Sequence, residues 1–75
     1  MAKEHCQLAK IFGFNVKRRR VELGLTQAEV AEQLGIRVSP DNISRIESGY
    51  IAPRFNRIEK IAKILKCKPS QLFEE

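Results

Sequence analysis

Residues 26–49 have the sequence TQAEVAEQLGIRVSPDNISRIESG, which contains the start signals of two helices. Thr26 is followed three residues later by Glu29, a capping box in which the two side chains satisfy free backbone N–H groups at a helix start. Ser39 and Pro40 give a second start, because serine caps free N–H groups and proline fits the first helical position. Glycines at positions 35 and 49 end the two segments. The stretch therefore predicts two short helices, residues 26–34 and 39–49, joined by a brief turn at 36–38.

The segment before this pair is also helical in pattern. Apolar residues in the range 8–23 recur mostly at steps of three and four, and Gly24 follows as a C-terminal cap. Gly13 costs roughly 1 kcal/mol relative to alanine inside a helix. We therefore expect this helix to begin near Phe12.

Two proline-led segments complete the chain. Pro53 introduces a helix, and Pro69 starts a last turn or two that ends in Leu72-Phe73. The apolar positions after Pro53 are Phe55, Ile58, Ile61, Ala62 and Leu65. This spacing fits a 3.6-residue repeat and contradicts strict alternation, so no strand is predicted. The expectation is an all-α fold of five short helices around one core, with residues 1–75 as a single domain.

Composition limits the classes of function. The chain has 75 residues, with 14 Lys and Arg against 9 Asp and Glu, and a net charge of +5. This length predicts one small domain with no room for an enzyme cleft between two lobes. No apolar run approaches the ~20 residues that span a bilayer, and nothing resembles a secretory signal. We expect a cytoplasmic protein that is not an enzyme and does not act at a membrane.

Cysteine and histidine give no sign of a metal or catalytic centre. Cys6, Cys67 and the single His5 are too few and too far apart for a zinc cluster. No local arrangement supplies His5 with a nucleophile and an orienting acid. A disulfide between the cysteines stays open, but two free thiols are the expectation for a cytosolic chain.

The outward face of residues 39–49 is the informative surface. If Ile43 and Ile46 point inward, the exposed side consists largely of Pro40, Asp41, Ser44, Arg45 and Ser48. Short side chains near the start of this helix allow close approach to a major groove, where Arg45 can bind a guanine edge with two hydrogen bonds. A plain solvated face is an equally weighted alternative.

Cations cluster at two further places. The run at 17–20 reads KRRR, and Arg54, Arg57 and Lys60 gather at the start of the helix after Pro53. A helix N-terminus repels cations, so the arginines there favour contact with phosphate over simple solvation. For the run at 17–20, both interpretations stay open.

Several separated motifs together resemble the Cro/C1-type (XRE-like) helix-turn-helix family of phage and bacterial repressors. They are GLTQ at 24–27, Ala31, LG at 34–35 and ISRIESG at 43–49, followed by the apolar residues of the last two helices. The resemblance covers about residues 12–73. It implies a five-helix, lambda-repressor-like domain that binds operator DNA as a homodimer, with helix 39–49 in the major groove.

The resemblance also implies roles for individual residues. Gln27 would contact a backbone phosphate and brace the start of the third helix. Arg20 would pair with Glu47 as a surface ion pair and leave one edge of the arginine facing phosphate. Asn42 and Arg54 would contact the DNA backbone. The expected backbone contacts are Gln27, Arg20, Asn42, Arg54, Arg37 and Arg57, and the expected base contacts are Arg45, Ser44, Asp41 and Pro40.

The sequence departs from the family pattern at several positions. Two extra residues lengthen the turn at 36–38, where Arg37 has even chances of reaching phosphate or of being a plain surface residue. Asp41 could accept a hydrogen bond from a cytosine amine, but a structural role at the helix N-terminus is favoured. Arg19 replaces a usual leucine, so its stem must cover apolar surface while its head reaches water. Cys67 falls at a usually apolar core position, as a small buried hydrophobe would.

The leading hypothesis is therefore a regulator of transcription that binds specific double-stranded DNA, with no cofactor. A restriction–modification controller, a phage-type repressor and an antitoxin are not separated by the sequence. The alternative is a protein-interaction module with DNA binding secondary, for which Ile51, Leu72 and Phe73 would form an exposed apolar patch. In the leading hypothesis the same three residues would serve dimerisation. A general RNA or nucleoid binder is weaker, because few exposed aromatic residues are available for stacking.

Overall fold

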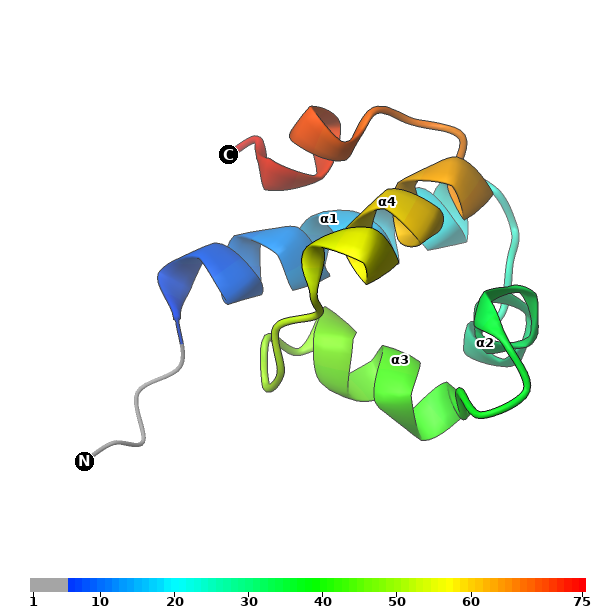
Figure 1. Cartoon of the computed structure of the whole chain (residues 1–75). Coiled ribbons are helices and arrows are strands. Elements are labelled where there is room, and N and C mark those ends of the chain that lie inside the picture. The colour runs from blue at the N-terminus through cyan, green and yellow to red at the C-terminus, as the bar shows by residue number, and fades with distance from the viewer. Residues whose placement is uncertain (1–5) are drawn as a thin grey trace.

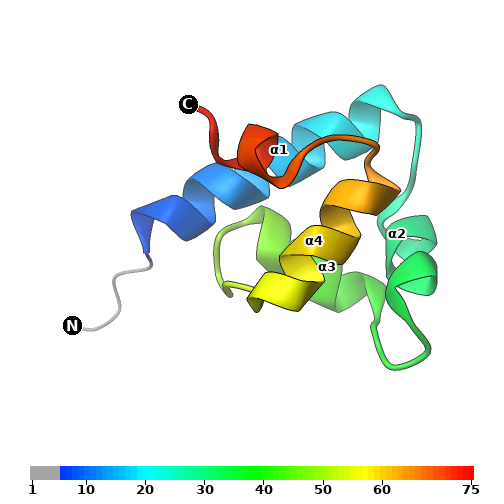
Figure 2. The same cartoon turned by 45° about the horizontal axis from the view of Figure 1, so that its top comes forward.

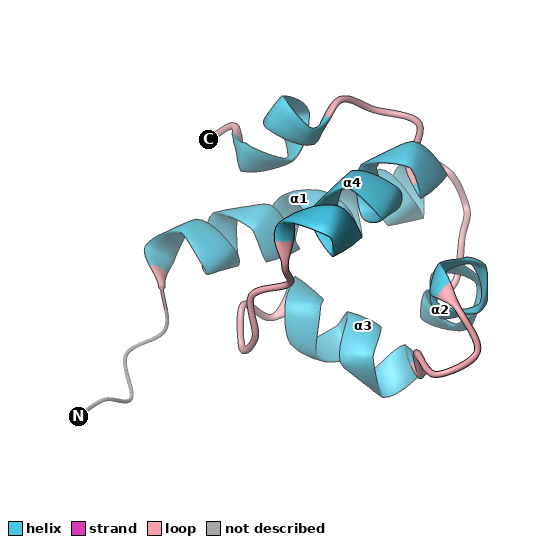
Figure 3. Cartoon of the chain, viewed as in Figure 1, coloured by secondary structure: helices cyan, strands magenta, loops and turns pink. Residues whose placement is uncertain are grey.

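A computed structural model describes residues 6–75 of the chain (Figure 1), so His5 lies outside the described residues. Its elements are the α-helices α1 (Gln7–Glu22), α2 (Gln27–Leu34), α3 (Pro40–Glu47) and α4 (Phe55–Ile64) and the 3₁₀-helix η1 (Pro69–Phe73). The described residues contain no strand (Figure 3). The all-α class is confirmed. The expected fifth helix is a 3₁₀-helix, so residues 6–75 hold four α-helices and not five.

The helices pack in a layered arrangement around α1. Helix α1 contacts α3 and η1, which lie on opposite sides of it in Figure 1, while α2 contacts α3 and α4. In the turned view of Figure 2, the connection between α2 and α3 extends from the body of the molecule as a loop. No helix within residues 6–75 has the length and apolar character that a membrane span requires.

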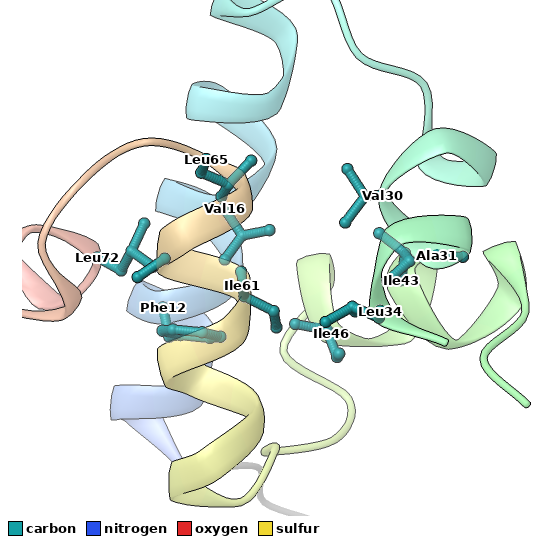
Figure 4. Packing of buried hydrophobic residues seen from close by; sticks show 11 residues of the cluster. Phe12, Val16, Val30, Ala31, Leu34, Ile43, Ile46, Ile61, Leu65 and Leu72 are labelled. Atoms are coloured by element: carbon teal, nitrogen blue, oxygen red, sulfur yellow. The ribbon is translucent and has the colours of Figure 1, made fainter. Parts of the chain in front are cut away.

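The core draws side chains from every element. Figure 4 shows them converging between α1, α4 and the α2–α3 pair. The buried cluster consists of Phe12, Val16, Val30, Ala31, Leu34, Ile43, Ile46, Ile61, Ala62, Leu65 and Leu72. Phe73 packs on Phe12 with ring centroids 5.0 Å apart. The predicted inward positions Ile43 and Ile46 are confirmed, and Val30, Ala31 and Leu34 of α2 are buried with them.

Helix α1 begins earlier than the sequence predicts. It starts at Gln7, five residues before the expected Phe12, and passes through Gly13 without interruption. A Cβ atom on Gly13 would lie 2.2 Å from the carbonyl oxygen of Ile46 and 2.7 Å from that of Glu47. The glycine is present because α1 and the end of α3 are in backbone contact there. Tertiary packing therefore outweighs the low helix propensity on which the sequence prediction was based.

The two predicted helix starts differ in how they are capped. The capping box of α2 is confirmed: Thr26 Oγ1 accepts from the backbone N–H of Glu29 at 3.0 Å, and Glu29 Oε1 accepts from that of Thr26 at 2.8 Å. The predicted side-chain cap of α3 is wrong. Ser39 Oγ donates instead to Asn42 Oδ1 at 2.7 Å, so α3 begins with Pro40 and without a serine cap.

The C-terminal segment is fixed to α1 by a buried asparagine that sequence reasoning missed. Asn15 Nδ2 donates to the carbonyl oxygens of Leu72 at 3.0 Å and Glu74 at 2.8 Å. Its Oδ1 accepts from Arg18 Nη2 at 3.1 Å, so the buried amide is satisfied on both sides. Asn15 therefore adds hydrogen bonds to the apolar contact of Phe12 with Phe73 between α1 and η1.

Arg19 of α1 binds the C-terminal end of α4, a role that the sequence does not predict. Its side chain is 36% exposed, in agreement with the predicted head that reaches water. Its Nε donates to the carbonyl oxygen of Leu65 at 2.9 Å and its Nη2 to that of Lys66 at 3.3 Å. These are free carbonyls at a helix C-terminus, where a cation is favourable. Nearby Cys67 packs against the core as a free thiol, and partial burial raises its pKa despite the opposing effect of Arg19. Exposed Cys6 is also a free thiol.

The Gly13→Ala variant tests the contact between α1 and α3. Alanine normally stabilises a helix interior relative to glycine. Here the new methyl group would meet backbone atoms of α3, which cannot rotate away. We expect the free energy of unfolding, measured in urea, to fall by about 1–3 kcal/mol, the usual cost of overpacking. A gain in stability would contradict the close approach of the two backbones.

Candidate nucleic-acid interface

Helix α3 has one buried and one exposed face. Ile43 and Ile46 are buried, and the helix forms the lower edge of the molecule in Figure 1. The structure exposes every residue that the sequence placed on the outward face, namely Pro40, Asp41, Ser44, Arg45 and Ser48. We call these five residues the outward face of α3. They form a short, polar surface that no other element of residues 6–75 covers.

One ion pair lies on this outward face. Arg45 Nη2 is 3.7 Å from Asp41 Oδ2, one helical turn apart, and the two side chains are 59% and 78% exposed. An exposed pair of this kind contributes little to stability. The pair places the guanidinium of Arg45 beside the carboxylate of Asp41, toward the N-terminal end of α3.

Glu47 lies at the opposite side of α3 and joins three helices. Its carboxylate accepts from Arg20 Nε of α1 at 2.6 Å and from Arg20 Nη2 at 3.1 Å. It also accepts from Gln27 Nε2, at the start of α2, at 3.0 Å. Arg20 Nη1 donates in turn to the carbonyl oxygen of Leu25 at 2.8 Å. We call this set of Arg20, Gln27 and Glu47 the brace.

The brace confirms the Arg20–Glu47 pair and corrects its expected setting. The sequence interpretation treats it as a surface pair, yet the side chains are only 12% and 4% exposed. Every guanidinium nitrogen of Arg20 already donates within the protein. Arg20 therefore positions α3 against α1, and its contact with phosphate stays a prediction.

Several of the expected backbone-contact residues lie together beside α3. A shallow groove of about 350 Å³ runs between α3 and the start of α4. It is lined by Asn42, Ile46, Ile51, Ala52, Pro53, Arg54, Asn56 and Arg57. Asn42, Arg54 and Arg57 are thus brought together, and Asn56 joins them although no sequence signal marks it. Arg37 is exposed in the loop before α3, where Val38 N–H donates to the Gly35 carbonyl oxygen at 3.2 Å.

The expected apolar patch of Ile51, Leu72 and Phe73 does not form. Leu72 is 2% exposed and belongs to the core, and Phe73 is half-buried against Phe12, whereas Ile51 is exposed. A segment as short as residues 69–73 has too few residues for a periodicity that would separate a core leucine from a surface one.

An apolar groove exists elsewhere, beyond the C-terminal end of α3. It is lined by Cys6, Leu8, Ala9, Phe12, Ala52, Pro53, Phe55, Ile58 and Phe73, which we call the apolar groove. Phe55, one of the apolar positions of the helix expected after Pro53, is 88% exposed, and Leu8 is exposed as well. Phe55 is the first residue of α4, whereas the buried residues of this helix, Ile61 and Ala62, lie in its second half.

A helix-turn-helix family model matches residues 16–72 of the chain. Among solved structures, the chain is similar to the SOS-response transcriptional repressor LexA from Eubacterium rectale, with 27% identity and a TM-score of 0.82 over 100% of this chain and 76% of that chain. It is also similar to the restriction-modification controller protein C.AhdI from Aeromonas hydrophila, with 26% identity and a TM-score of 0.78 over 87% of this chain and 91% of that one.

Some of the similar structures are those of an enzyme. The hydroxypropylphosphonic acid epoxidase from S. wedmorenis shares 22% identity and a TM-score of 0.82 over 89% of this chain, but over only 35% of its own chain. At this identity the likeness shows the fold alone. A comparison with curated protein sequences finds no match.

The Glu47→Ala variant tests the brace. Without the carboxylate, Arg20 would stay largely buried with no counter-charge, and loss of one partner of such a pair typically costs about 3–5 kcal/mol. We expect a loss of this size in the free energy of unfolding measured in urea. The matched control is Glu22→Ala, which removes an exposed carboxylate paired with Arg19 at 3.3 Å. Its cost should stay below about 1 kcal/mol. Equal losses in the two variants would contradict the structural role of the brace.

Proposed function

This chain belongs to the helix-turn-helix family, and from that premise we propose that it is a transcriptional regulator that binds specific sequences of double-stranded DNA. The observation that carries the proposal is the outward face of α3, which is exposed and largely polar. On its inner side the same helix is joined to α1 and α2 by the brace. An α-helix with its side chains is about 10–12 Å in diameter, and a major groove of about 12 Å width admits it. No cofactor and no catalytic step are part of the proposed function, and the cytoplasmic location stays a prediction.

In this function the outward face of α3 reads base edges. Arg45 donates two hydrogen bonds to O6 and N7 of a guanine, the commonest specific contact in a major groove. Ser44 and Asp41 lie beside it on the same face, and Pro40 offers apolar contact to a thymine methyl group. These contacts discriminate between sequences.

Residues on both sides of α3 bind the sugar-phosphate backbone. Arg54, Arg57 and Asn42 act from the groove beside α4, to which we add Asn56. Arg37 acts from the loop before α3, and Gln27 from the start of α2. Arg20 acts chiefly through Glu47. Such contacts supply most of the affinity and fix the register of α3 in the groove, but carry no sequence information.

We further propose that a single domain of residues 1–75 acts as a homodimer on a pseudo-palindromic operator. Two copies of α3 would then lie about 34 Å apart, one turn of DNA. Of the residues first assigned to dimerisation, Ile51 is exposed, Phe73 lines the apolar groove and Leu72 is buried. The contact therefore centres on Ile51 and the apolar groove with Phe55, beyond the C-terminal end of α3.

The apolar groove also supports one alternative function. An antitoxin or other interaction module would use the same groove to hold a different protein, with DNA binding secondary. The similarity to C.AhdI supports control of restriction and modification as one possible process, beside the repression suggested by the similarity to LexA. A neighbouring methyltransferase gene would indicate restriction–modification control, and a neighbouring toxin gene would indicate an antitoxin.

Binding to DNA should depend steeply on salt if phosphate contacts supply the affinity. Selection from a random duplex pool would first give the preferred sequence, and fluorescence anisotropy would then measure affinity at several salt concentrations. Each neutralised phosphate contributes a slope of about −0.9 in log K against log salt. A flat salt dependence, together with no enriched sequence, would contradict the function and favour the interaction module.

Arg45→Ala and Arg54→Ala should weaken binding in different ways. Loss of Arg45 is expected to cost about 1–3 kcal/mol on the selected sequence and to relax base preference at one position. Loss of Arg54 should weaken binding to all sequences about equally and reduce the salt slope by about one. If Arg45→Ala also weakened all sequences equally, Arg45 would be a phosphate ligand.

Phe55→Glu should dissociate the dimer. A carboxylate in the apolar groove would have to be desolvated on association, at a cost that a small interface cannot offset. The matched control is Phe14→Glu, because Phe14 is an equally large exposed residue on α1 outside this groove. Sedimentation equilibrium should show a weakened dimer for Phe55→Glu alone. A monomeric parent chain, or dissociation by the Phe14 variant alone, would exclude the apolar groove as the interface.

A further inference from the structure

The outward face of α3 is electrically neutral, which is unexpected for a surface that approaches DNA. Helix α3 has three charged residues, and one of them, Glu47, is bound on the inner side by Arg20 and Gln27. The other two, Asp41 and Arg45, have opposite charges and both lie on the outward face. The attraction of Arg45 for a polyanion is therefore opposed by a carboxylate one turn away.

A role at the helix N-terminus accounts for only part of this arrangement. An acidic residue in the first turn is favoured by the helix dipole, and Asp41 occupies that turn. The dipole alone does not require the carboxylate to face Arg45, yet Asp41 Oδ2 lies 3.7 Å from Arg45 Nη2. The carboxylate thus lies where it can pair with the guanidinium of Arg45.

The chemistry of the major groove limits what Asp41 can contact. An ionised carboxylate only accepts hydrogen bonds. The groove presents two donors, N4 of cytosine and N6 of adenine, whereas guanine presents acceptors and thymine an acceptor and a methyl group. Asp41 is therefore repelled by phosphates and by guanine or thymine edges, and cytosine N4 is the usual partner of an acidic side chain.

We propose that Asp41 is a specificity-determining residue, which aims Arg45 at a guanine and itself accepts from cytosine N4 at a nearby base pair. Residues four apart lie about 6 Å apart along a helix, and base pairs are stacked about 3.4 Å apart. The pair therefore reads two positions, one or two steps apart. On other sequences the carboxylate has no donor and repels the DNA. This inference rests on the proposed function and assigns to Asp41, one of the residues on the base-reading face, a specific base and a positioning role toward Arg45.

The Asp41→Asn variant separates discrimination from affinity. Asparagine keeps the size of the side chain and removes its charge. Affinity would be measured by anisotropy at one salt concentration, on the sequence selected by the parent chain and on a duplex of equal length without the selected motif. We expect affinity for the unselected duplex to rise and the ratio of the two affinities to fall by about fivefold or more, the smaller end of the effect of one base contact. Repeated selection should lose the cytosine preference beside the guanine.

The matched control is Glu32→Gln, which removes one negative charge from an exposed position on α2. It should change the affinity for both duplexes by similar factors and leave their ratio unchanged. If Asp41→Asn behaved in the same way, Asp41 would act through net charge alone and the inference would be wrong, although the proposed function would stand. If the parent chain bound no duplex in a salt-dependent way, both would fail. Circular dichroism of the variant should match that of the parent chain.

Discussion

The buried carboxylate of Glu47 is the constraint on which the arrangement of α1, α2 and α3 depends. A charge removed from water must find donors, and this one has Arg20 Nε, Arg20 Nη2 and Gln27 Nε2, from two other helices. Helices as short as α2 and α3 are not stable alone, so their orientation must come from tertiary contacts. Apolar packing holds the helices together but is not directional. The brace supplies the direction and so sets which face of α3 points outward.

The sequence predicts the fold well wherever a local signal coincides with a tertiary requirement. The capping box of Thr26 and Glu29 and the spacing of Ile43 and Ile46 are local patterns, and both predictions hold. The predicted start of α1 was wrong because a distant contact decides it. Gly13 lowers helix propensity locally, but it allows the backbone of α1 to approach that of α3 at Ile46, 33 residues further along the chain. Nothing near residue 13 in the sequence contains that information.

The sequence predicted which residues of α3 are exposed at the candidate site. It did not predict which residues of the other helices pack around them. A helical period places Asp41, Ser44 and Arg45 outward as soon as the inward isoleucines are known, and the structure agrees. The burial of the Arg20–Glu47 pair could not be read from the residues, because it depends on how closely three helices meet. Asn56 shares a groove with Asn42 only because α4 returns beside α3. Burial of Leu72 and exposure of Phe55 likewise depend on where a short segment meets the core.

The hydrogen bonds of Asn15 have a practical consequence for handling the molecule. They hold the carbonyls of Leu72 and Glu74 against α1, on the side of that helix away from α3 (Figure 1). A fluorophore or affinity tag joined behind Glu75 would start from this fixed point. It would therefore leave the chain on the side of α1 away from α3. There it can report on tumbling or tether the protein to a surface without covering the outward face of α3.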